Sequence, residues 1–262
     1  VVLIGTVYPI FLDVISSEKI SVGPPFYNKL IVPFLIPFLL FMSLGPKLKW
    51  IKSKIENKKS LIITFLISSM LSFLIIKNLT IELLLYTILV AAAFFLFFTT
   101  LKEFFIKKFN NISQLVAHLG FSLLVLSILF NSILSSEIIT NIKIGEKYTY
   151  SNGEIFFKKI EEKKESNFNS IIAYFEIKDE SGKIVKLKPE IRIYNQPSII
   201  TSEADIKTSL LEDKFLVMNL VKGNEYFNIR YQTKPLMVWI WISVLLLSLG
   251  GLISLVKKKH EK

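Results

Sequence analysis

The sequence predicts a mainly α-helical fold: a polytopic bundle of transmembrane helices with an antiparallel β domain inserted outside the membrane. Hydrophobic residues make up 52% of the 262-residue chain. Several apolar stretches approach the roughly 20 residues that a helix needs to cross a bilayer. A polar segment, 135–235, separates the last two of these stretches, and its short runs alternate apolar and polar side chains as strands do.

Six stretches are predicted to span the membrane. The chain starts at Val1, inside an apolar run and without a methionine, so we expect it to be the C-terminal part of a longer protein whose first span here is truncated. The predicted organisation is five spans in 1–134, a β domain in 135–235, and a final span with a basic tail in 236–262. The spans are expected at 1–12, 28–46, 60–77, 80–101, 114–134 and 236–256.

The positive charge of the chain predicts its orientation. Three segments, 47–59, 102–112 and the tail 257–262, carry six, three and four lysines against one glutamate each, and so hold ten of the eleven net positive charges. They fall on one side if the spans alternate, and lysine-rich loops mark the cytoplasmic side. Segments 13–27 and 135–235 then lie outside. Because the basic residues are explained by topology, we do not expect nucleic-acid binding.

The outer segment 135–235 is predicted to be a small antiparallel barrel or sandwich. Turn residues separate its β-prone runs, at 151–153, 179–182 and 222–224. The runs are KIGEKYTY, EIFFKKI, SIIAYFEIK, KIVKL, EIRIYN, KFLVMNLV and YFNIRYQ.

His118 is the residue that most invites a functional interpretation. It is one of two histidines in the chain and stands inside the fifth span, whereas His260 lies in the tail beside three lysines. One interpretation is a neutral imidazole that is hydrogen-bonded to a neighbouring helix or lies near the lipid headgroups. The other is an axial ligand of haem iron, with Ala117 and Gly120 letting a flat macrocycle or another helix approach. A proton relay is disfavoured, because we expect no second ionisable group at comparable depth.

Two further motifs are predicted to be structural or partner-facing. The outer loop KISVGPPFYN sets a rigid turn before the second span, since glycine and proline restrict the backbone there. The last span opens with two tryptophans near the outer interface, typical of an aromatic belt or the border of a flat apolar ligand. The residues are Gly23, Pro24, Pro25, Tyr27, Asn28, Trp239 and Trp241.

No catalytic apparatus is predicted in this chain. It has no cysteine, and therefore no disulfide, thiolate metal site or cysteine nucleophile. We find no phosphate-binding glycine loop, metal cluster or hydrolytic triad in the sequence.

Several motifs together resemble the C-terminal half of the CcmF family of cytochrome c-type biogenesis proteins, to which NrfE-like proteins are related. The resemblance is collinear over essentially all 262 residues. It rests on GTVYP, KISVGPPFYN, AHLG, TSEADIKTSLLEDKFLV and KPLMVWIWISVLLLSLGGLISL.

The resemblance implies a haem lyase subunit of the bacterial inner membrane that attaches haem to the CxxCH motif of apocytochrome c. It implies the haem chaperone CcmE and a CcmH-type subunit as partners, and a b-type haem for which His118, in the AHLG context, is one axial ligand. The second ligand and the tryptophan-rich haem-binding loop of the family lie upstream of Val1. The alternative is a non-catalytic membrane scaffold or transporter subunit with an external β domain.

Overall fold

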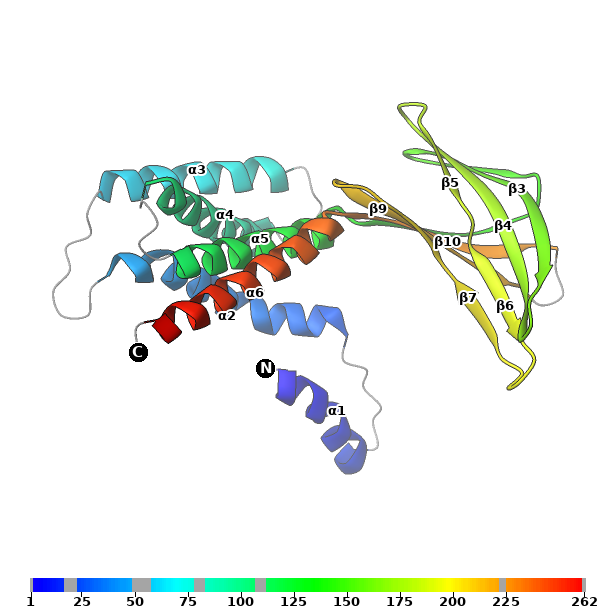
Figure 1. Ribbon diagram of the computed structural model, residues 1–262, viewed down its shortest axis with the longest axis horizontal. Helices are drawn as coiled ribbons and strands as arrows, with labels where there is room; N and C mark the ends of the chain where they lie inside the picture. Colours follow the sequence, from blue (N-terminus) through cyan, green and yellow to red (C-terminus); the bar gives the residue numbers. More distant parts are fainter. Residues whose placement is uncertain are drawn as a thin grey trace. The chain divides into compact units, whose positions relative to one another are not determined.

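The computed structural model of the protein describes residues 2–16, 23–48, 58–77, 83–106, 112–221 and 225–260. The chain divides into two compact units, one of residues 1–126 and 242–262 and the other of residues 127–241. Long apolar helices precede and follow a set of antiparallel strands (Figure 1). The predicted fold class, a mainly helical membrane protein with an inserted antiparallel β domain, is therefore confirmed.

Four helices of the described residues are long and apolar enough to cross a bilayer, with spans at 58–76, 84–105, 112–134 and 237–256. Two more helices contain shorter apolar stretches, Leu3–Ser16 and Leu30–Leu44. The chain is thus a multi-pass membrane protein. The helices are α1 (Val2–Ser16), α2 (Pro24–Leu44), α3 (Lys58–Ile76), α4 (Leu83–Ile106), α5 (Ile112–Leu134) and α6 (Met237–His260), and a short 3₁₀ helix, η1 (Gly45–Lys47), follows α2.

Two helices differ from the predicted spans in ways that affect function. Helix α2 begins at Pro24 rather than at 28, because proline is well suited to the first helical positions, where its missing N–H costs nothing. Helix α4 continues to Ile106, five residues beyond the predicted end at 101. This extension places Glu103, counted from the sequence as a loop charge, on a helix.

Helix α4 is the centre of the helical unit. Both α2 and α3 pack along it, as the α3–α4 pair in Figure 1 shows. Half of its apolar membrane-spanning stretch is buried inside the protein, against 17% for that of α3. The hydroxyl of Ser72 on α3 donates to the carbonyl of Thr87 on α4 at 2.6 Å. This hydrogen bond joins two helices at a depth where lipid offers no alternative partner.

The described residues of the second unit form ten strands in two sheets, and all their pairings are antiparallel. One sheet has the order β1-β10-β9-β8, and the other β2-β3-β4-β6-β7 with β5 paired to β4. The strands are β1 (Ser136–Ile142), β2 (Lys147–Tyr150), β3 (Gly153–Lys164), β4 (Phe168–Asp179), β5 (Ile184–Leu187), β6 (Glu190–Tyr194), β7 (Ile200–Glu203), β8 (Asp205–Thr208), β9 (Glu212–Leu220) and β10 (Phe227–Pro235).

One core joins the two sheets, so the domain is a sandwich. Phe157 of one sheet stacks on Phe175 with ring centroids 4.3 Å apart, and it meets the edge of Phe227 from the other sheet at 5.4 Å. The remaining fully buried members come from both sheets and include Ile155, Ile177, Leu216, Ile229 and Tyr231. Alternation along the strands delivers these side chains to one face of each sheet.

The strand prediction holds for seven of the ten strands. The structure adds β1, β7 and β8, which the sequence did not indicate. The predicted turn at 151–153 joins β2 to β3, with Gly153 at φ +152°, and the one at 179–182 joins β4 to β5, with Gly182 at φ +81°. Residues 222–224, the third predicted turn, lie outside the described residues.

Candidate functional site

His118 lies on α5, six residues after the helix begins at Ile112. At 1.5 Å per residue, this is about 9 Å along the helix. The side chain is neither fully buried nor fully exposed. His118 is therefore a partly accessible imidazole inside a membrane-spanning segment.

The small residues next to His118 are used for contact between α5 and α6. A Cβ atom added to Gly120 would lie 2.8 Å from the backbone nitrogen of Leu247, and one added to Gly250 would lie 2.7 Å from the backbone nitrogen of Ala117. The Ser113 hydroxyl donates to the Gly250 carbonyl at 2.8 Å. Of the two uses that the sequence allowed for Ala117 and Gly120, the structure shows close approach of a helix.

His118 belongs to a different face of α5 from these small residues. Residues three and four apart share a helix face, so His118 shares one with Phe121 and Ser122. Phe121 meets Phe38 of α2 edge to face, with ring centroids 5.8 Å apart, and Ser122 is fully buried. His118 is thus on the side of α5 that carries contacts to α2, away from α6.

Two further ionisable residues accompany His118 at the same end of the helical unit. Lys47 of η1 and Glu103 of α4 form an ion pair with N–O distance 3.0 Å, and both side chains are at least four-fifths buried. The Lys47 ammonium also donates to the Ser43 carbonyl at 3.0 Å. Glu103 is close enough to His118 to act electrostatically on it. The sequence, which assigned Glu103 to a loop, gave no sign of this electrostatic neighbour of His118.

No hydrogen bond joins the His118 imidazole to another described residue; an imidazole near the lipid headgroups needs none from the protein, so both interpretations stand. The described residues contain no group of three or more His, Cys, Asp or Glu side chains that could enclose a metal ion. One imidazole suits an iron whose other ligands come from a macrocycle and a second axial group.

A small apolar cavity between α2, α3 and α4 is not a candidate for haem. Its volume is about 180 Å³ and His118 does not line it. Sites for drug-sized ligands are about 300–1,000 Å³. This cavity is therefore separate from His118.

The predicted outer-loop motif forms the start of α2. Gly23 is the residue before the helix, with extended φ and ψ of −111° and −176°, and its carbonyl accepts from the Phe26 nitrogen at 3.1 Å. The ring of Tyr27 packs against Gly5 of α1, where an added Cβ would lie 2.7 Å from it. The side chains of Pro24, Pro25 and Asn28 lie outside the described residues, as does that of His260.

The two tryptophans of α6 differ in their surroundings. The indole N–H of Trp239 donates to the Leu210 carbonyl at 2.9 Å. Trp241 is 66% exposed. The sequence predicted one shared role for the two tryptophans at the outer interface. Of the two, Trp239 is the one that is hydrogen-bonded to the β8–β9 turn.

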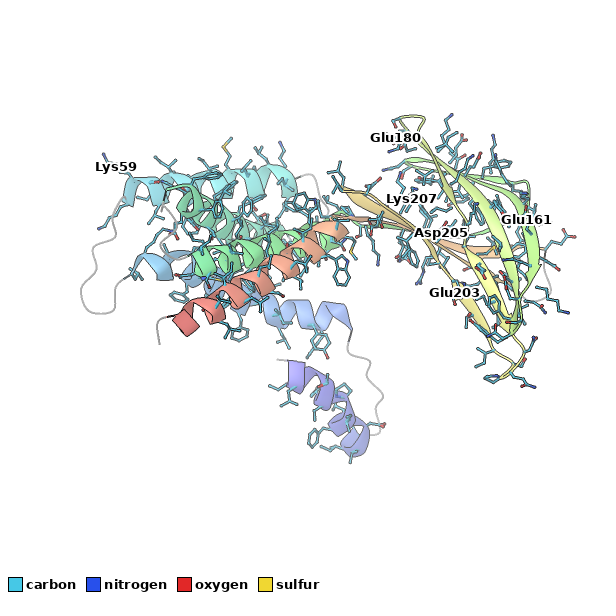
Figure 2. All side chains as sticks on the ribbon, viewed as in Figure 1. Lys59, Glu161, Glu180, Glu203, Asp205 and Lys207 are labelled. Carbon is cyan, nitrogen blue, oxygen red and sulfur yellow. The ribbon has the colours of Figure 1, made fainter. Side chains whose placement is uncertain are left out.

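The charged residues of the sandwich form local pairs rather than a catalytic group. Lys159 and Tyr174 hold the pKa of the Glu161 carboxyl below its usual value, and the Ser181 hydroxyl does the same for Asp179. Figure 2 shows charged side chains around the whole sandwich, including Glu161 and Glu180. These perturbed groups are surface ion pairs and hydrogen bonds, and no cluster of metal-binding side chains accompanies them among the described residues.

Comparison with known proteins finds relatives that match this chain over nearly all of its length. Residues 133–235 match the model of the CcmF C-terminal β-sandwich. The chain is 24% identical to the cytochrome c-type biogenesis protein CcmF of Pseudomonas fluorescens and 25% identical to that of Escherichia coli K12, over 99% and 100% of its length. It is 22% identical to NrfE of Haemophilus influenzae over 99% of its length. In each case it spans 42% of the relative.

A solved structure has the same fold. The cytochrome c haem lyase CcmF superposes with a TM-score of 0.72 at 20% identity, covering 96% of this chain and 42% of the other. The resemblance to the C-terminal half of the CcmF family, with NrfE-like proteins similar, is thus confirmed. The matched β-sandwich also agrees with the two packed sheets and decides between the sandwich and barrel alternatives.

Proposed function

We propose that this chain, which carries the CcmF-type β-sandwich and aligns with the C-terminal part of CcmF and NrfE proteins, is a portion of a membrane haem lyase subunit for cytochrome c maturation. The observation that carries the proposal is the match along the whole chain, helices as well as sandwich. Since the chain spans less than half of these relatives, the activity belongs to the complete protein. That activity is attachment of haem to the CxxCH thiols of apocytochrome c.

In this proposal His118 is one axial ligand of a b-type haem. Supporting observations are its place in a membrane-spanning helix and its partial accessibility. The second axial ligand would come from a part of the protein outside this sequence, because the other histidine, His260, is in the basic tail. When bound, the b-type haem would supply electrons that keep the substrate iron ferrous.

The residues of this chain would hold and orient the ligand. Contact between α5 and α6 through Gly120 and Gly250 fixes the rotation of α5 about its axis, and so fixes the face that carries His118. The charge pair of Glu103 and Lys47 would set the electrostatic environment of the imidazole. Burial and charge near the ligand are the means by which a protein tunes a haem potential.

The sandwich is proposed to face the periplasm and to dock partners. The basic segments at 47–59, 102–112 and the tail would lie in the cytoplasm, which puts 13–27 and 135–235 on the outer side of the inner membrane. Candidate partners are the haem chaperone CcmE, a CcmH-type subunit and apocytochrome c itself. The many charged side chains of the sandwich favour docking.

Substitution of His118 tests the haem assignment. In the full-length protein, His118→Ala should abolish the reduced b-type haem spectrum per mole of inserted protein and also cytochrome c assembly. The fold should survive, because an imidazole is removed without adding charge to the membrane. His260→Ala is the matched control and should retain both properties. An inserted, stable His118→Ala protein with an unaltered haem spectrum would contradict the assignment.

Labelling with an impermeant thiol reagent tests the orientation. The chain has no cysteine of its own, so single cysteines at Ser53 and Ser166 report without background. Ser166 should label from outside intact cells, and Ser53 only after the inner membrane is opened. Labelling of both positions from the same side would show that the proposed topology is wrong.

A further inference from the structure

The turn between β8 and β9 presents two leucines at its tip. Ser209 closes the turn: its hydroxyl donates to the Glu212 carbonyl at 2.7 Å, and its backbone nitrogen donates to the same carbonyl at 3.1 Å. Leu210 and Leu211 between them are 66% and 73% exposed. Tight turns favour glycine, asparagine, aspartate and serine, so two adjacent exposed leucines are not explained by the turn.

The same turn is hydrogen-bonded to the start of α6. The Leu236 nitrogen donates to the Leu211 carbonyl at 2.8 Å, and the Trp239 indole donates to the Leu210 carbonyl at 2.9 Å. The last residue of β10, Pro235, pairs with Glu212 at the beginning of β9. Backbone and side-chain bonds therefore fix the tip beside residues 235–239, as the β9 hairpin and the first turn of α6 show in Figure 1.

This attachment determines the depth of the tip. The membrane span of α6 starts at Met237, so Trp239 is about 3 Å into the span at 1.5 Å per residue. Tryptophan is favoured at the headgroup level, where one end of its ring is wet and the other apolar. A turn bonded to Leu236 and Trp239 must lie at that level too.

We propose that the β8–β9 tip inserts Leu210 and Leu211 into the headgroup and upper acyl-chain region of the lipid bilayer, beside the point where α6 enters. The occupant of this apolar surface is lipid rather than a protein partner, because the surface is held at the level where a membrane-spanning helix begins. The carbonyls of both leucines accept the hydrogen bonds, which leaves their side chains free to contact lipid. The tip would act as a second anchor of the sandwich, independent of any haem.

Single-cysteine fluorescence tests this proposal. Cysteines at Leu210 and, separately, at Leu211 would carry an environment-sensitive fluorophore in the full protein reconstituted into phosphatidylcholine vesicles. The matched control is a cysteine at Ser181, an exposed residue in the β4–β5 turn of the same sandwich. We expect blue-shifted emission at 210 and 211, quenched by nitroxide groups on the lipid acyl chains, and neither effect at 181.

Two outcomes would overturn the proposal. If iodide in the aqueous phase quenches labels at 210 and 211 as strongly as at 181, the tip is in water. If neither iodide nor lipid nitroxides quench them, protein covers the tip. Because the hydrogen bonds involve main-chain carbonyls, cysteine at either position should not remove them. Two independent positions keep the test decisive if one variant is poorly produced.

Discussion

The helical unit and the sandwich of this protein bury different mixtures of side chains. In the sandwich the fully buried side chains are large and apolar, with Phe157 and Phe175 at the centre. In the helices the buried positions include Ser43, Ser68 and Thr99, together with alanines 91–93. Many large apolar side chains of the helices are exposed, among them Phe41 at 73% and Phe105 at 76%, whereas Leu39 and Phe95 are buried.

The difference follows from the solvent that each unit meets. Water drives large apolar groups to the inside of the sandwich. Lipid gives no such drive, so helices associate through close backbone approach and hydrogen bonds. Gly120 and Gly250 allow close backbone approach, and Ser72 provides a hydrogen bond between helices. A buried phenylalanine of the sandwich and an exposed phenylalanine of the helices should therefore contribute differently to stability, which mutation can test.

Phe157→Ala should have the largest effect on stability. The side chain is fully buried and touches two other rings, and such a deletion costs about 3–5 kcal/mol in a water-surrounded core. Urea denaturation of residues 135–235 expressed alone, followed by the circular dichroism signal of the strands, would measure this loss of stability. A mainly helical spectrum of the parent fragment would contradict the sandwich itself.

Phe105→Ala on α4 is the matched membrane variant. It should cost far less, because the exposed ring leaves lipid rather than a packed core. Thermal unfolding of the full chain in lipid nanodiscs would compare it with the parent. A loss as large as that of Phe157→Ala would show that Phe105 is covered by protein.

Gly120→Leu should have an intermediate effect. Backbone atoms of α6, Leu247 N at 2.8 Å and Ser243 O at 3.0 Å, occupy the space of the new side chain, and overpacking typically costs about 1–3 kcal/mol. Gly251→Leu is the control, since nothing lies within 4 Å of its added Cβ. Thermal unfolding in nanodiscs should separate the two. Equal melting temperatures would mean that α5 and α6 are not in contact there.

Ser72→Ala should have the smallest effect. It removes one hydrogen bond between α3 and α4, and such bonds average about 0.6 kcal/mol in membrane proteins. Ser248→Ala is the control, because that hydroxyl donates only to Val244 of its own helix at 2.9 Å. The same unfolding assay should detect a loss for the first and none for the second. A reversed order would contradict the role given to Ser72.

The strands that the sequence failed to predict share a position. β1 and β8 are the two edges of one sheet, and β7 is an edge of the other. β7 and β8 have four residues each. An edge strand pairs on one side only and buries fewer side chains, so its alternation is weak. The central strands β3, β4, β9 and β10 were predicted because they supply most of the core between the two sheets, so their side chains alternate clearly.

The candidate site was partly predictable for a related reason. His118 stood out because an ionisable residue in an apolar stretch is costly and therefore informative. Its companions Lys47 and Glu103 did not stand out, because each followed a predicted span end and looked like a loop charge. Their pairing joins residues 56 positions apart, which no local pattern contains. Glu103 can pair with Lys47 because α4 continues to Ile106, beyond its predicted end.

The paired arrangement of β1 and β10 makes the sandwich a self-contained module. The two strands are hydrogen-bonded neighbours along Ser136–Ile142. One starts two residues after α5 ends, and the other ends two residues before α6 begins. Entry and exit thus lie side by side, so closing the gap between them costs little chain entropy. A protein engineer could replace everything between Ile142 and Phe227 with a short hairpin loop, and evolution could exchange this module without redesigning the helices.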